Sequence, residues 1–138
     1  MKANNFSFLI ALSFLLLPFS AYGFFSPSVN RAMDKTKECN KTQSNHAYFE
    51  CMSRNNYQLK LSINKTVEQS TKDYPKYKKN KIKSYVKNKK LNITKTCMNE
   101  QSKLGGSMNS DRRHIYCAYE HLLELQINLE RNIDFYAK

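Results

Sequence analysis

The fold of this chain is decided by the stretch Cys97-Met98-Asn99-Glu100-Gln101-Ser102-Lys103-Leu104-Gly105-Gly106-Ser107, which runs on to Cys117. A Lys-rich helical segment stops at the two glycines, and a strongly amphipathic segment starts after them. One cysteine precedes the turn and one follows it. The pattern predicts a helical hairpin that is held by a disulfide across its bend.

The segment after the glycines has the clearest helical pattern of the chain. Its apolar residues recur at spacings of 3, 4, 3, 4, 4 and 3, namely Ile115, Ala118, Leu122, Leu125, Leu129, Ile133 and Tyr136. Charged residues lie opposite this stripe, as in an amphipathic helix. Ser110-Asp111 is expected to cap it, because a negative side chain stabilises the positive end of the helix dipole. The short connection predicts an antiparallel neighbour, which brings Cys97 beside Cys117.

That neighbour is the basic segment 76–103. Its apolar residues are spaced by 4, 7 and 4, namely Ile82, Val86, Ile93 and Cys97. Lys89-Lys90 leaves a gap in this apolar face, so its contribution to the core is expected to be thin. Gly105-Gly106 is expected to end the helix in a left-handed turn, which glycine adopts without steric cost.

An earlier helix is predicted after the turn-forming residues 40–44. Its apolar positions are Met52, Leu59, Ile63 and Val67, at helical spacing. Asp73-Tyr74-Pro75 is expected to end it, because proline lacks an amide hydrogen and disfavours helix before it. Residues 24–38 are expected to be a loosely held arm with a turn or two of helix. The predicted fold is all-α, a disulfide-stapled antiparallel three-helix bundle with room for a short extra N-terminal helix.

The first 23 residues have the pattern of a secretory signal peptide. Lys2 precedes an apolar run at 8–19, and Ala21-Tyr22-Gly23 places small residues at the −3 and −1 positions of a cut after Gly23. The run is shorter than the roughly 20 residues that span a bilayer. We therefore expect a periplasmic or secreted protein with a signal peptide at 1–23, an arm at 24–38 and a helical domain at 39–138.

All four cysteines follow the predicted cut: Cys39, Cys51, Cys97 and Cys117. An even number in an exported chain indicates two disulfides. Of the three connectivities we favour Cys39–Cys51 with Cys97–Cys117, because each pair flanks a predicted turn. The first pair requires the chain to double back near 40–45, since one straight helix would separate these cysteines by about 18 Å. The alternative is a zinc site that uses His114 or His121.

Positive charge is concentrated in one segment. The whole chain has a formal charge of +12, and the chain after Gly23 has 22 basic and 11 acidic residues, or +11. Residues 72–103 hold eleven lysines and two acids, or +9, whereas 24–71 carry +3 and 104–138 carry −1. Such a face attracts phosphate-rich surfaces, lipopolysaccharide, nucleic acid or an acidic protein. The alternative is a solvated helix face that keeps a small protein soluble.

The cysteine spacing resembles that of a known family. Cys39 and Cys51, with eleven residues between them and followed by Ile63-Asn64, are similar to the opening pattern of the LprI-type lysozyme-inhibitor family of small bacterial envelope proteins. Gln43 matches a glutamine of that opening. Cys97 with Glu100, then Gly105-Gly106-Ser107 and Cys117 ahead of Leu122 and Leu125, is similar to its C-terminal signature. The resemblance spans about residues 39–133 and implies a helical, disulfide-stapled periplasmic protein that binds lysozyme.

The resulting hypothesis is a non-enzymatic inhibitor that blocks the acidic cleft of lysozyme with a cationic tip. The candidate tip is either the arginine pair Arg112 and Arg113 or a lysine group, namely Lys76, Lys78, Lys79, Lys81 and Lys83. The chain has no nucleophile-elbow, phosphate-loop or zinc-protease motif. With paired cysteines it has no reactive thiol. We therefore predict no enzymatic activity, no cofactor, no metal and no small-molecule substrate.

A second hypothesis assigns the function to the basic segment itself. The helix at Lys72–Lys103 mixes lysine and tyrosine, which suits contacts with phosphates and stacking on bases. An exported location favours anionic lipid, lipopolysaccharide or another polyanion of the envelope over nucleic acid. The triplets at Asn40, Asn64 and Asn92 would be glycosylation sites in a eukaryotic source, where a small secreted helical factor would be the rival interpretation.

Overall fold

The computed structural model describes residues 25–103, 105 and 108–138, and every regular element within them is helical. The elements are α1 (Pro27–Asn40), α2 (Asn45–Ser70), α3 (Lys76–Lys103), α4 (Met108–Asn132) and the short 3-10 helix η1 (Ile133–Ala137). The all-α prediction is therefore confirmed. The predicted signal peptide lies outside the described residues.

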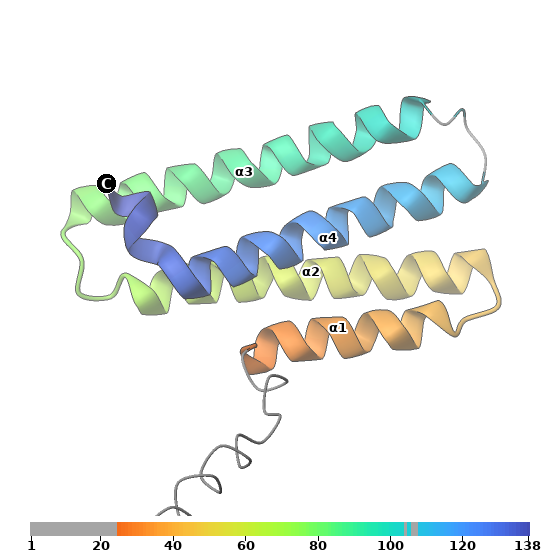
Figure 1. Ribbon diagram of the computed structural model, residues 1–138, viewed down its shortest axis with the longest axis horizontal. Helices are drawn as coiled ribbons and strands as arrows, with labels where there is room; N and C mark the ends of the chain where they lie inside the picture. Colours follow the sequence, from red (N-terminus) through yellow and green to blue (C-terminus); the bar gives the residue numbers. More distant parts are fainter. Residues whose placement is uncertain (1–24, 104, 106–107) are drawn as a thin grey trace, which may run out of the picture.

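Helix α4 holds the molecule together. It packs against α2, α3 and α1, and in Figure 1 it runs between α2 and α3, while α1 lies along α2. Successive helices run in opposite directions, as the short turns between them require. After α4 the chain turns back as η1, which packs against both α3 and α4.

The apolar stripe predicted for the last helix supplies the centre of the core. Leu122, Leu125 and Leu129 are almost completely buried against side chains of α2 and α3 such as Ile63 and Ile82. The prediction was wrong at both ends of this helix. It begins at Met108, two residues before the expected cap, and Asp111 lies within its first turn. It ends at Asn132, so that the remaining two residues of the predicted stripe, Ile133 and Tyr136, lie in η1.

The residues expected to form a loose arm form a 14-residue helix instead. Ser26 caps α1 by accepting a hydrogen bond from the Val29 amide at 3.3 Å. Pro27 occupies the first helical position, where its missing amide hydrogen costs nothing. The helix buries a stripe spaced by 3, 4 and 3, namely Val29, Ala32, Thr36 and Cys39. Because the stripe contains small and polar residues, it offers few large apolar side chains by which the sequence could reveal a buried helix.

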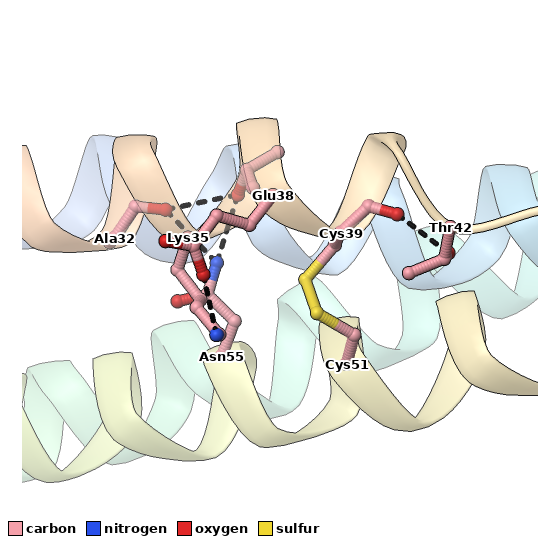
Figure 2. The surroundings of a disulfide bond; sticks show 8 residues. Ala32, Lys35, Glu38, Cys39, Thr42, Cys51 and Asn55 are labelled. Carbon is pink, nitrogen blue, oxygen red and sulfur yellow. Dashed lines mark hydrogen bonds and ion pairs between the residues drawn. A yellow bond between two sulfur atoms is a disulfide. The ribbon is translucent and has the colours of Figure 1, made fainter.

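Polar contacts fix α1 on α2 beside the first disulfide (Figure 2). The Asn55 side-chain amide donates to the Ala32 carbonyl oxygen at 3.0 Å and to the Thr36 hydroxyl at 2.8 Å. The Thr42 hydroxyl donates to the Cys39 carbonyl oxygen at 2.7 Å in the turn that follows α1. These bonds satisfy buried polar groups, which would otherwise carry a large desolvation cost.

Both predicted disulfides are confirmed. Cys39 is bonded to Cys51 with their Cα atoms 5.5 Å apart, and Cys97 is bonded to Cys117 with a Cα separation of 5.7 Å. The chain doubles back between α1 and α2, as the first bond requires. At the second bend α3 ends at Lys103, and Gly105 has the predicted left-handed conformation with φ of 59°. Gly106 lies outside the described residues.

The central position of α4 makes its buried leucines the most sensitive apolar side chains. Leu122→Ala should lower the free energy of unfolding by about 2–5 kcal/mol, because the substitution leaves a cavity between packed helices. Leu91→Ala is the matched control, since Leu91 is 53 % exposed. It should change stability by no more than about 0.5 kcal/mol. Urea unfolding followed by circular dichroism measures both, and equal losses would contradict this description of the core.

Candidate functional site

Five lysines of α3 follow one side of the helix. Their spacings of 3, 4, 4 and 3 place them on a single helical ridge, which comprises Lys76, Lys79, Lys83, Lys87 and Lys90. The buried residues of α3 lie next to this ridge, namely Ile82, Val86, Ile93 and Cys97. The lysine ridge therefore borders the core instead of pointing directly away from it.

Side-chain contacts connect the lysine ridge to α2. The Lys83 ammonium lies 2.7 Å from the Glu68 carboxylate. The Lys90 ammonium donates to the Asn64 side-chain oxygen at 2.7 Å and more weakly to the Lys60 carbonyl oxygen at 3.4 Å. Polar side chains thus join α2 and α3 along the side on which the ridge lies.

A groove of about 360 Å³ lies between these two helices. Asn64, Val67 and Glu68 of α2 form one wall, and the other wall is formed by α3 residues, namely Lys83, Val86, Lys87 and Lys90. Val67 and Val86 are buried and give the groove an apolar floor. We call this feature the α2–α3 groove.

The charged groups of the α2–α3 groove differ in their environments. Burial lowers the pKa of the Lys90 ammonium, and the neighbouring positive charge of Lys60 lowers it further. The hydrogen bond from Lys83, and then its charge, lowers the pKa of the Glu68 carboxyl group. Glu68 is therefore matched to Lys83, whereas the half-buried cation of Lys90 is held by neutral oxygens and lies near a second cation.

The structure does not bring the predicted partner-binding residues together. Lys76, Lys78, Lys79, Lys81 and Lys83 occupy the first two turns of α3, whereas Arg112 and Arg113 lie near the start of α4. These are opposite ends of the molecule (Figure 1). Arg113 lies beside Glu100, and the residues of α3 between Glu100 and these lysines correspond to a separation of about 25–35 Å. The two predicted groups therefore cannot form one site.

The two arginines are also occupied by contacts within the protein. The Arg112 guanidinium lies 4.3 Å from the centre of the Tyr48 ring, so it packs α4 against α2. Arg113 lies between two carboxylates, 4.0 Å from Glu100 and 3.8 Å from Glu120. Of the predicted groups, the lysines at the start of α3 are thus the more available to a partner.

Two of these lysines contact backbone oxygens. Lys79 donates to the Lys72 carbonyl oxygen at 2.6 Å, and Lys81 donates to the carbonyl oxygen of Lys138. Close by, the rings of Tyr85 and Tyr136 stack with centroids 4.3 Å apart. The contact of Lys81 and the stacked rings hold the C-terminal residues against α3.

The sequence analysis missed a second, larger groove of about 880 Å³. It lies mainly between α1 and α2, and its charged lining mixes both signs, namely Arg31, Asp34, Lys35, Glu38, Arg54, Lys65 and Glu130. The groove depends on the packing of α1, which the sequence did not reveal. Its balanced charge gives it no general preference for anions.

A polar cluster around the buried Gln126 adjoins that second groove. Gln126 is completely buried within the apolar stripe of α4 and donates to the Thr66 hydroxyl at 2.8 Å and to the Glu130 carboxylate at 2.5 Å. Ser26 and Ser28 donate to the same Glu130 oxygen at 2.7 and 3.0 Å. The cluster ties the start of α1 to α4. The only sequence signal was a glutamine next to the leucines of the stripe.

The alternative zinc site can be assessed within the described residues. Cys97, Cys117 and His121 bring potential ligand atoms within 4.8 Å of one another. The two sulfurs are bonded to each other and so provide no thiolate ligands. His121 lies instead 3.7 Å from the Glu124 carboxylate.

None of the described helices has the length and apolar character needed to cross a membrane. No protein-family model, curated protein or solved structure matches this chain.

The geometry of the α2–α3 groove predicts a measurable titration. The Lys90 ammonium should titrate below the ordinary lysine pKa, and Lys60→Gln should raise its pKa part of the way back. Burial, the larger cause, persists in that variant. NMR titration of the lysine side chains measures both values. A normal pKa for Lys90, or no response to Lys60→Gln, would contradict the described geometry.

Proposed function

We propose that this chain is an exported, non-catalytic binding protein whose helix α3 docks on anionic surfaces of the cell envelope. In this proposal α2, α3 and α4 form an antiparallel three-helix bundle that displays the basic helix. One disulfide joins α3 to α4, and the other joins α1 to α2. The exported location rests on the signal-peptide pattern of residues 1–23. The absence of catalysis is supported by the four cysteines, all of which are paired and so offer no nucleophilic thiol.

The observation that carries the proposal is the uncompensated charge of α3. The helix contains ten lysines and one acid, Glu100. Within the described part of the chain, Lys83 is the one lysine of this helix that forms an ion pair with an acidic side chain. In α1, by contrast, Lys35 and Lys37 are paired with Glu38 and Asp34. The positive potential of α3 is thus available to an external anion.

A helix face that is only solvated does not require so strong a positive potential. An anionic membrane would be attracted by it. Lysines lie on both sides of the buried stripe of α3, and eight of its ten lysines fall within residues 76–90, so the charge is dense around the first half of the helix. Each lysine close to an anionic bilayer contributes roughly 1 kcal/mol to binding. Several lysines acting together therefore produce strong, salt-dependent attachment without any single specific contact.

Binding to vesicles tests this proposal. The protein, purified without residues 1–23, should bind vesicles of equal parts phosphatidylcholine and phosphatidylglycerol and should not bind phosphatidylcholine alone. Replacement of Lys76, Lys89 and Lys95 by Gln should weaken binding roughly tenfold or more, because three lysine contributions are lost. Added salt should also weaken it, since exposed charges are screened within about 10 Å at 0.1 M.

The matched control removes the same charge from α1, α2 and the turn between them. Replacement of Lys37, Lys41 and Lys65 by Gln lowers the net charge equally but leaves α3 intact. Its effect on vesicle binding should be much smaller, as cosedimentation would show. Equal losses in the two triple variants, or binding that ignores salt, would overturn the docking role of α3.

Lysozyme inhibition is the second candidate function, and one observation favours a particular form of it. Lys76 and Tyr77 are exposed at the very start of α3, where Tyr77 is 67 % accessible to solvent. This corner has the cationic and aromatic character that insertion into an acidic cleft requires. Because lysozymes are themselves usually cationic, long-range repulsion would slow the encounter. We therefore rank this candidate below anionic-surface docking.

A cell-wall lysis assay tests the second candidate. If the corner inserts into the cleft, Lys76→Glu with Lys78→Glu should abolish inhibition, because the introduced charges would meet the acidic cleft. Arg113→Glu is the control and should leave inhibition unchanged, since Arg113 lies at the other end of the molecule. The absence of protection by the unaltered protein at micromolar excess would end this candidate.

A further inference from the structure

The Lys90 ammonium lacks the partner that a half-buried charge ordinarily has. It donates to two neutral oxygens, the Asn64 side-chain oxygen and the Lys60 carbonyl oxygen. Among the described residues no carboxylate forms an ion pair with it. Neutral acceptors satisfy its hydrogen bonds but leave its charge uncompensated, and a charge removed from water is costly without a counter-charge.

The surroundings of Lys90 increase its positive potential. Lys87 lines the same α2–α3 groove, and Lys60 lies close enough to repel the Lys90 charge. Glu68, the one acid among the described residues that line the groove, is already matched by Lys83 at 2.7 Å. Within the part of the chain that the structure describes, the ammonium groups of Lys60, Lys87 and Lys90 form no ion pair with a carboxylate.

We infer that the α2–α3 groove binds a phosphate group, which Lys87 and Lys90 contact directly. Asn64 acts as a positioning residue, because its side-chain oxygen holds the Lys90 ammonium while its amide hydrogens remain able to donate to the ligand. The volume of about 360 Å³ accommodates a phosphate group with its water. The inference deepens the docking function and rests on it for the source of the phosphate, a lipid headgroup.

Phosphate fits this groove better than a carboxylate does. Lys87 and Lys90 line the groove, and Lys60 adds positive charge close to Lys90. Lysine acts as a compact point charge that suits the several oxygens of a phosphate. The buried valines beneath the groove exclude water from one side, which strengthens electrostatic attraction. A bound anion would also relieve the repulsion between Lys60 and Lys90.

The first experiment uses inorganic phosphate and compares two variants that remove the same charge from α3. Titration at constant ionic strength, followed by NMR of the lysine side chains, should give saturable shifts at Lys87 and Lys90. Lys90→Gln should weaken binding roughly tenfold or more, because it removes a charge-assisted hydrogen bond. Lys95→Gln should change it by less than about twofold, since exposed charges away from the site contribute little.

Circular dichroism of both variants verifies that they fold. Lys87→Gln is a further variant, at an exposed position of the same groove, and it should also weaken phosphate binding. Shifts that do not saturate, or equal effects of Lys90→Gln and Lys95→Gln, would overturn the inference.

A second experiment separates the two sources of phosphate and separates this inference from the docking function. Vesicles of equal parts phosphatidylcholine and phosphatidic acid should lose more affinity with Lys90→Gln than with Lys95→Gln, which identifies the headgroup as ligand. If Lys90→Gln weakens the binding of inorganic phosphate but not the binding of vesicles, the ligand of the groove is free phosphate. That result would overturn the lipid headgroup as the ligand. A third outcome is vesicle binding that weakens with salt, an equal loss of vesicle affinity in the two variants and no saturable binding of inorganic phosphate. This outcome would overturn the groove as a phosphate site and leave the docking function of α3 in place.

Discussion

The apolar stripe of α4 is the constraint on which the rest of the structure depends. Its buried residues, which extend from Ile115 to Leu129, have to be covered on more than one side, so α4 packs against α1, α2 and α3 together. This packing constrains the positions of the other helices. Helix α3 buries only four side chains in 28 residues, all of them in the core that α4 organises. The orientation of its lysines, and hence the α2–α3 groove, follows from that packing.

The covalent bonds act at one end of this arrangement. The turns between α1 and α2 and between α3 and α4 lie at the same end in Figure 1, and each has a disulfide close to it. A disulfide that closes a short loop contributes about 3 kcal/mol, mainly by restricting the unfolded chain. At the opposite end η1 holds the helices by noncovalent contacts, through the stack of Tyr136 on Tyr85 and the hydrogen bond from Tyr74 to Asp134. The start of α3, with its cluster of lysines, thus belongs to the end without cross-links.

The sequence predicted what depends on strong periodicity or on cysteine spacing. The buried part of the α4 stripe, from Ile115 to Leu129, the buried residues of α3 and both disulfides are found where the pattern placed them. The packing of α1 could not be predicted, because its buried face contains Ala32 and Thr36 instead of large apolar residues. Spacing alone places five lysines on one ridge, but it does not reveal that α2 lies beside that ridge. The contact of Arg112 with Tyr48 likewise joins residues far apart in the sequence, so a predicted binding residue turned out to support packing.

The charge of α3 and its thin core have a common physical consequence. Ten lysines on one helix repel one another, and four buried side chains offset that repulsion only in part. The aliphatic stems of lysines that border the core cover apolar surface while their ammonium groups reach solvent, which links the charge to the packing. An anion bound along α3 would remove repulsion that the folded protein otherwise carries. Because such an anion binds the folded chain and not the unfolded one, it would also stabilise the helix. Binding and stability are therefore coupled most strongly in the part of the molecule that the disulfides do not reach.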